Sequence, residues 1–68
     1  MMRVELEREN INTTIFKLPE RWNMQPYRIE RVFVNNNVIP PAFYYMMGPR
    51  TICIKDDVDR STRIFADI

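Results

Sequence analysis

Residues 26–37 read PYRIERVFVNNN, and the fold expected for the chain depends on how this segment is interpreted. Ile29, Val32 and Phe33 have the i, i+3, i+4 spacing of an apolar stripe on one face of a helix. The proline is well placed to begin a helix. The three asparagines suit its end, since asparagine accepts the left-handed conformation of a helix C-cap. The pattern predicts a helix from Pro26 to Asn36.

Upstream of this helix, Lys17–Trp22 has the features of another helix start. Pro19 is tolerated in a first helical turn, and Glu20 suits the positive end of the helix dipole. Asn23–Pro26 then interrupts the pattern, because proline disfavours helix at the residue before it. Trp22 is interpreted as a core anchor. Before this helix, Thr13–Phe16 is β-branched and aromatic and predicts a short strand.

Downstream, the pattern becomes strand-like. Phe43–Met46 and Thr51–Ile54 flank Met47–Arg50, a turn that carries the chain's only glycine, so a β-hairpin is expected. Lys55–Arg60 is acidic, with Asp56 or Asp57 as the N-cap of a short C-terminal helix. Val58, Ile64 or Phe65, and Ile68 would form the inner face of that helix.

These elements predict an α+β fold of the winged helix-turn-helix type. Its order is a short strand, two helices, a β-hairpin wing and a short C-terminal helix. The domain is expected over residues 13–68. Residues 1–12 form a polar N-terminal arm, in which Val4 and Leu6 also permit a short edge strand.

Several short motifs resemble the MerR-like winged-helix family. Leu18–Met24 is similar to its first helix and turn, and Tyr27–Phe33 to its recognition helix. Ile39–Phe43, Gly48–Thr51 and Ile54–Asp59 resemble the wing and last-helix segments of small phage and mobile-element members. In size the chain is most similar to the excisionase (recombination directionality factor) group and the AlpA-type regulators. The resemblance covers about residues 15–65.

This resemblance implies DNA binding without catalysis. An excisionase is an architectural factor that bends DNA near attachment sites and steers an integrase toward excision. The expected partners are therefore double-stranded DNA, an integrase and neighbouring copies of the chain on the DNA. A transcriptional regulator on the same fold is the alternative.

The residue types along the predicted recognition helix suit contacts to DNA. Arg28 and Arg31 lie one helical turn apart and are suited to a guanine edge or a phosphate, and Asn35 to adenine. Gln25 and Tyr27 are suited to phosphate. The remaining candidates are Gly48 and Arg50 on the wing, with Arg21 and Lys55 as backbone contacts.

The charge distribution agrees with a phosphate-binding middle. The net charge is +1 overall, but residues 1–20 carry −1, residues 21–55 carry +4 and residues 56–68 carry −2. Binding through these cations would weaken steeply with salt.

The chain lacks the residues that several other classes of protein need. The 68-residue chain has no histidine and one cysteine, which excludes an internal disulfide and leaves no zinc site. It also has no glycine-rich phosphate loop, so neither an enzyme nor a cofactor is expected. Cys53, between Ile52 and Ile54, is expected to be a buried small hydrophobe.

The sequence offers no membrane span and no small-molecule site. The longest apolar stretch, Ala42–Met47, is far shorter than the roughly 20 residues of a transmembrane helix, and the N-terminus has no apolar signal region. The expected location is the cytoplasm, near the nucleoid or in a host cell if the protein is phage-encoded.

A protein-interaction module, such as a phage-encoded inhibitor or virion component, is the alternative from a different class. The low net charge and the apolar Tyr44–Met47 segment suit it. The same segment is otherwise interpreted as core and hairpin packing rather than as a base-stacking platform.

Overall fold

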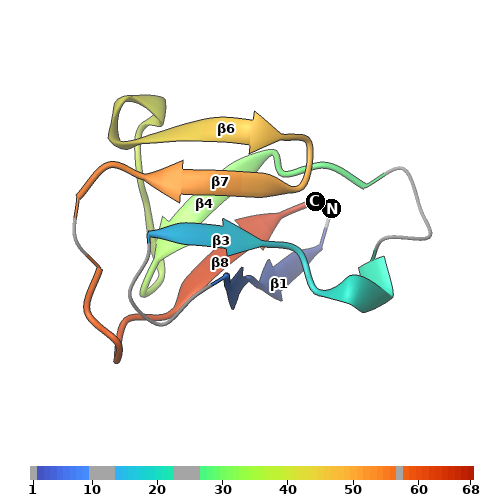
Figure 1. Cartoon of the computed structure of the whole chain (residues 1–68), viewed down its shortest axis with the longest axis horizontal. Helices are drawn as coiled ribbons and strands as arrows, with labels where there is room; N and C mark the ends of the chain where they lie inside the picture. The colour runs from blue at the N-terminus through green and yellow to red at the C-terminus, as the bar shows by residue number, and fades with distance from the viewer. Residues whose placement is uncertain (1, 10–13, 23–26, 57) are drawn as a thin grey trace.

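The computed structural model describes residues 2–9, 14–22, 27–56 and 58–68, and within them the chain is all-β (Figure 1). Two antiparallel four-stranded sheets make up the fold. The described helical segments are two 3₁₀ turns, η1 (Glu20–Trp22) and η2 (Pro41–Phe43). The α+β winged helix-turn-helix prediction is therefore wrong.

Each sheet draws strands from distant parts of the chain. The first sheet has the order β1 (Arg3–Glu5), β8 (Ile64–Asp67), β4 (Arg31–Val34), β5 (Asn37–Val38). The second has the order β2 (Glu7–Arg8), β3 (Ile15–Lys17), β7 (Thr51–Ile54), β6 (Tyr44–Gly48). In Figure 1 the second sheet lies in front, and the strands of the first cross obliquely behind it.

The chain passes between the sheets along both sides of this sandwich. On one side, Leu6 links β1 to β2, and its N–H still donates to the carbonyl of Ile64 at 2.8 Å. On the other side, η2 links β5 to β6, the outermost strands of the two sheets. Both sides are thus bridged by continuous backbone.

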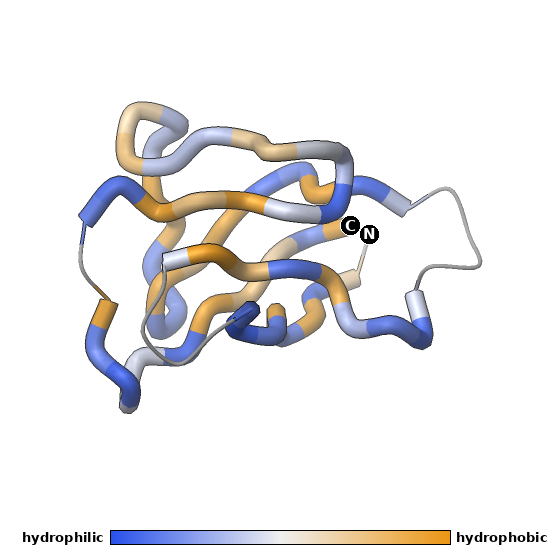
Figure 2. The backbone as a smooth tube through the Cα atoms, in the orientation of Figure 1, coloured by the Kyte–Doolittle hydropathy of each residue, from blue (hydrophilic) through white to orange (hydrophobic). Residues whose placement is uncertain are grey.

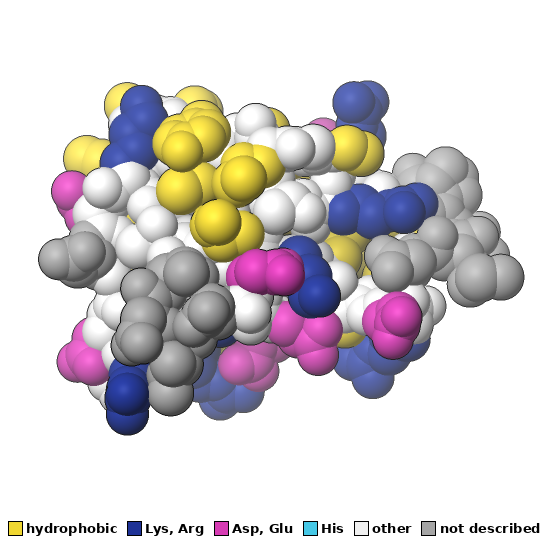
Figure 3. Space-filling view, viewed as in Figure 1, with side chains coloured by type: hydrophobic (Ala, Val, Ile, Leu, Met, Phe, Trp, Pro, Cys, Tyr) yellow, Lys and Arg dark blue, Asp and Glu magenta, His cyan; other side chains and the backbone are white. Residues whose placement is uncertain are grey.

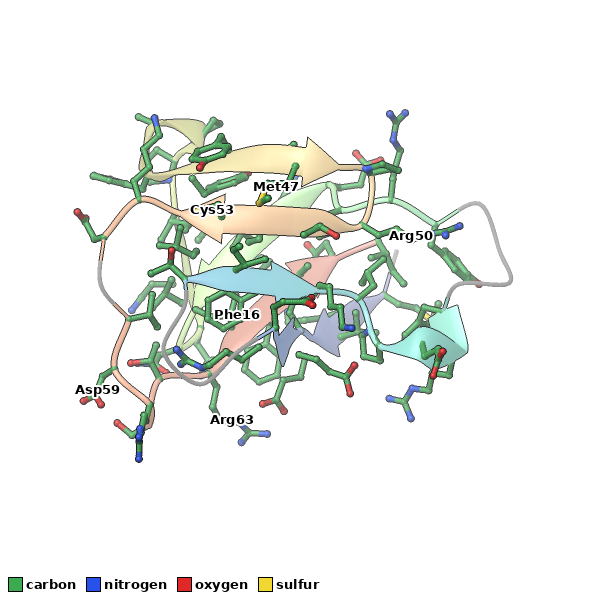
Figure 4. The ribbon with its side chains drawn as sticks, viewed as in Figure 1. Phe16, Met47, Arg50, Cys53, Asp59 and Arg63 are labelled. Atoms are coloured by element: carbon green, nitrogen blue, oxygen red, sulfur yellow. The ribbon has the colours of Figure 1, made fainter. Side chains whose placement is uncertain are left out.

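The core fills the space between the sheets. Side chains alternate along each strand, so one residue in two points inward. Hydrophobic stretches accordingly occur on strands of both layers (Figure 2), and Phe16 lies between them (Figure 4). The buried cluster consists of Val4, Leu6, Phe16, Leu18, Ile29, Val32, Ile52, Ile54, Ile64 and Ala66.

The helix expected over Pro26–Asn36 is replaced by extended chain. Residues 27–30 carry no regular structure, β4 follows, and the chain then reverses into β5. Asn35 and Asn36 both have positive φ, 54° and 89°, as a two-residue type I′ hairpin turn requires. The asparagines were expected to end a helix because they tolerate this conformation. In the structure the same tolerance lets them form a β-turn.

Phe33 explains why the segment resembled a helix. It points outward from the first sheet, in register with Phe65 and Val38, so it lies on the face opposite the core. It is nevertheless buried, and the Arg3 guanidinium lies 3.8 Å from its ring centroid. The i, i+3, i+4 stripe therefore mixes two residues of the core with one that a distant arginine covers.

The other two predicted helices are also absent from the described residues. η1 is a single turn closed by the Trp22 N–H to the Pro19 carbonyl at 2.9 Å. The C-terminal segment forms β8, in which Ile64 and Ala66 point into the core. Asp56 lies in a bend after β7 and caps no helix, and Asp57 is outside the described residues.

Three local predictions are confirmed. The β-hairpin exists as β6 and β7, with a bulge between Met46 and Gly48 that leaves Met47 without a partner in the strand register. The short strand expected over Thr13–Phe16 corresponds to β3. The edge strand permitted near Val4 is β1.

The segment set apart as a polar arm belongs to the sandwich in its described part. Residues 2–9 supply β1 and β2, and Val4 and Leu6 are core residues. Within the described residues, no helix has the length and apolar character needed to cross a membrane.

Candidate functional site

The residues predicted to contact DNA are distributed over both ends of the sandwich. Arg28 precedes β4 and Asn35 follows it, while Arg50 precedes β7 and Lys55 follows it. Arg31 begins β4 on the outer face of the first sheet. Gln25 lies outside the described residues. Within the described residues, no recognition helix carries these side chains.

The side chains of Tyr27, Arg21 and Asn35 contact other parts of the structure. Tyr27 packs edge-on against Trp22, with ring centroids 5.2 Å apart and planes at 81°. The Arg21 guanidinium lies 5.7 Å from the Trp22 ring. Asn35 accepts the Arg63 N–H through its side-chain oxygen at 3.1 Å, which ties the β4–β5 turn to the start of β8.

Shallow hollows bring some of the predicted residues together at one end. Arg28 and Gly48 line a hollow of about 480 Å³ with Ile29, Glu30, Met46 and Pro49. Arg50 lines another of about 410 Å³ with Lys17, Glu7 and Glu20 (Figure 4). In both hollows carboxylates accompany the cations, so neither forms a purely basic surface.

The outer face of the first sheet holds paired charges. Glu5 accepts hydrogen bonds from Arg63 at 2.6 and 3.2 Å, and these hydrogen bonds hold the pKa of Glu5 below its usual value. Arg3 donates to the nearly buried carboxylate of Asp67 at 3.4 Å. Salt bridges on an exposed face contribute little stability. They do neutralise much of the charge that this face would offer a polyanion.

The outer face of the second sheet carries Cys53 between Ile15 and Tyr45 in cross-strand register. The thiol is half-buried, with its sulfur 3.4 Å from the Thr14 hydroxyl and 3.8 Å from the Ile54 carbonyl, so the prediction of a buried hydrophobe is wrong. Hydrogen bonds from Thr14 and then from Tyr45 lower the pKa of the Cys53 thiol.

One side of the sandwich stands out through its lack of charge. Residues 35–49 include no charged residue, although charged residues make up 28% of the chain. They form β5, η2 and β6, and so supply one edge of each sheet and the bridge between these two edges. We call the surface formed by residues 37–48 the uncharged side.

Large apolar side chains are exposed along the uncharged side. Phe43, Tyr45, Met46 and Met47 are 44–52% exposed, and Val38 on β5 is 61% exposed. Figure 3 shows hydrophobic side chains gathered over β6 and β7. Tyr44–Met47 was interpreted as core and hairpin packing. All four residues belong to strand β6 of the hairpin, but of the four only Tyr44 packs against the core, where it is half-buried. Only Tyr44–Met47 was singled out from the sequence, and the charge-free run of residues 35–49 is the signal that would have shown the wider surface.

A third hollow lies beside the uncharged side, between the ends of the two sheets. Phe43, Val34, Ile39, Ile54 and Val58 line its apolar wall, and Asp56, Asp59 and Thr62 its polar rim, enclosing about 440 Å³. In the part of the chain that the structure describes, no three acidic or thiol side chains come together as metal ligands.

Comparisons with known proteins give no information about the site. No protein-family model, no curated protein and no solved structure matches this chain. The winged-helix resemblance is therefore without support from relatives, and the fold contradicts its helices. The class of protein rests on the geometry of the sandwich and of its uncharged side.

Proposed function

We propose that this protein is a protein-interaction module that binds its partner through the uncharged side. The observation that carries the proposal is the exposure of Tyr45, Met46 and Met47 on the edge strand β6, which has no charged residue, and of Phe43 just before it in η2. Aromatic residues and methionine are enriched in protein interfaces, and charged residues are depleted from the interface core.

The position of these residues at a sheet edge strengthens the proposal. Soluble proteins normally protect edge strands with charges, prolines or bulges, because an open edge pairs with other chains. Here the bulge at Met47 protects one end of β6, and β6 carries no charge along its length. An exposed apolar edge of this kind is typical of a surface that a partner covers.

Binding to duplex DNA stays a prediction. Cations supply most of the affinity for a phosphate backbone. Arg28 and Arg31 are both exposed, but Arg28 lies in an irregular segment and Arg31 at the start of β4, so no helix face groups them. Roles as an excisionase, an integrase partner or a transcriptional regulator depend on that binding. A salt-dependent titration of random duplex DNA against wild type and the Arg28→Ala, Arg31→Ala double variant tests it.

A photo-crosslinking experiment tests the interaction proposal directly. Benzoylphenylalanine is placed at Tyr45, or at Ser61 as an exposed control, and the protein is irradiated in the cells that make it. Mass spectrometry identifies the protein crosslinked in each adduct. That partner is then purified on its own and titrated against the chain. We expect an adduct at position 45 and none at position 61.

Matched charge variants decide whether the purified partner uses the uncharged side. Met47→Glu places a carboxylate on this surface, and Ser61→Glu places one on an exposed loop outside it. We expect Met47→Glu to weaken binding at least about tenfold, which corresponds to about 1.4 kcal/mol, and Ser61→Glu to leave it unchanged. Equal affinity of both variants would rule out the proposed surface.

A further inference from the structure

We propose that the partner on the uncharged side is a second copy of this chain, paired about a two-fold axis that passes beside Met46. This inference rests on the proposed function and specifies its partner. It follows from the direction of the free backbone groups on β6, from the charges at the two ends of that strand and from the area available.

The hydrogen-bonding pattern identifies the free backbone groups. The Ile54 N–H donates to the Thr14 carbonyl at 2.9 Å, so Ile54 points toward β3. Because residues of an antiparallel strand alternate between their two neighbours, Cys53 points toward β6 and pairs with Tyr45. Met46, the next residue on β6, then directs its N–H and C=O away from the sheet. No described strand lies on that side of β6.

These free groups are self-complementary. When two antiparallel strands meet about a two-fold axis, the residue on the axis donates to and accepts from its own counterpart. Met46 offers both groups, whereas the Tyr44 N–H is already bonded to the Pro41 carbonyl. The bulge at Met47 ends the regular strand, so the Met46 pair is the centre of a short contact.

Charge favours a second copy as the occupant. Residues 35–49 contain no charge, so two copies meet without like-charge repulsion. The exposed Arg28 and Glu30 lie near the end of β6, and the exposed Lys55 and Asp56 lie near its start. An antiparallel pairing brings the end of β6 in one copy to the start of β6 in the other, and each end carries one positive and one negative charge, so no excess of one sign accumulates.

The exposed apolar side chains of the uncharged side supply the contact area. Phe43, Tyr45, Met46 and Met47 lie along η2 and β6, and Val38 lies on β5. Weak and transient complexes bury less than about 1,200 Å² in total, so a short contact of this kind suits a dimer that forms at high protein concentration.

Light scattering during gel filtration measures the pairing. Between about 10 μM and about 1 mM, we expect the mass of the wild type to rise from near 8.3 kDa toward twice that value, as for a dissociation constant of about 100 μM. Met47→Glu should keep the mass at 8.3 kDa, and Ser61→Glu should behave as the wild type. A constant mass of 8.3 kDa for the wild type would overturn the proposal.

Disulfide trapping tests the position of the axis. In a Cys53→Ser background, Met46→Cys places one new thiol on each copy. The Cα atoms of the two cysteines would lie about 5.5 Å apart, within the range that a disulfide spans. We expect mild oxidation to link Met46→Cys into a dimer and to leave Ser61→Cys monomeric. Equal linkage of the two variants would contradict the axis. A monomeric wild type with crosslinks at Tyr45 to a different protein would reject the second copy and retain the proposed function.

Discussion

At the scale of single residues, Cys53 shows how neighbours change the chemistry of a side chain. The thiol lies on the outer face of the second sheet, within 3.4 Å of the Thr14 hydroxyl. A hydroxyl that donates to sulfur favours the thiolate, and this contact is the main cause of the lowered pKa of Cys53, ahead of the Tyr45 hydroxyl. A lowered pKa means a larger thiolate fraction at any given pH.

Thr14→Val removes this hydroxyl and keeps the shape of the side chain. We expect the pKa of the Cys53 thiol to rise, so that alkylation by iodoacetamide near neutral pH slows by about two- to threefold. The measurement is the pH profile of the alkylation rate, whose midpoint should move to higher pH. Thr51→Val, on the same strand as Cys53, is the control. An identical profile for both variants would show that Thr14 has no special effect on the thiol.

At the scale of elements, the turn between β4 and β5 determines how the first sheet is completed. Asn35 and Asn36 hold positive φ angles, which most residues with a Cβ adopt only at a cost of roughly 1–2 kcal/mol. Asn36→Gly should therefore preserve or raise the free energy of unfolding, and Asn36→Val should lower it by roughly 1–2 kcal/mol. Urea unfolding monitored by Trp22 fluorescence measures both. A glycine variant as unstable as the valine variant would contradict this turn.

The same elements show which parts of the fold local sequence reveals. The β6–β7 hairpin was predictable, because its strands and its turn lie within residues 43–54 and need no distant partner. β4 was not, because Ile29, Val32 and Phe33 fit a helical period. On the outer face, the guanidinium of Arg3 covers the Phe33 ring, and Arg3 lies thirty residues away along the chain. A local pattern cannot contain that contact.

The candidate site was predictable in one respect only. The notable feature of residues 35–49 is the absence of charge, which is visible in the sequence. That these residues form one edge of each sheet depends on pairings such as Arg31 with Asp67 and Ile15 with Cys53, which join segments far apart in the sequence. The cations expected on one helix face were separated for the same reason, since the helix that would have grouped them is a strand and a loop.

At the scale of the whole molecule, stability depends on a small core shared by two sheets. A chain of this length folds with about 3–10 kcal/mol to spare, because it buries a modest fraction of its surface. Leu6 has a central place in that core. It is 5% exposed, and it is the point where the chain leaves the first sheet and enters the second. The N-terminal residues are therefore part of the folding unit.

Leu6→Ala tests this dependence. The substitution leaves a cavity between the sheets, and we expect the free energy of unfolding to fall by about 2–4 kcal/mol, a large share of the total stability. Glu7→Ala, at the next and exposed position, should change it by less than about 0.5 kcal/mol. Urea unfolding curves of the three proteins give the comparison. If Leu6→Ala were as stable as Glu7→Ala, residues 2–9 would be a detached arm, and the continuous side that β1 and β2 form between the sheets would not exist in solution.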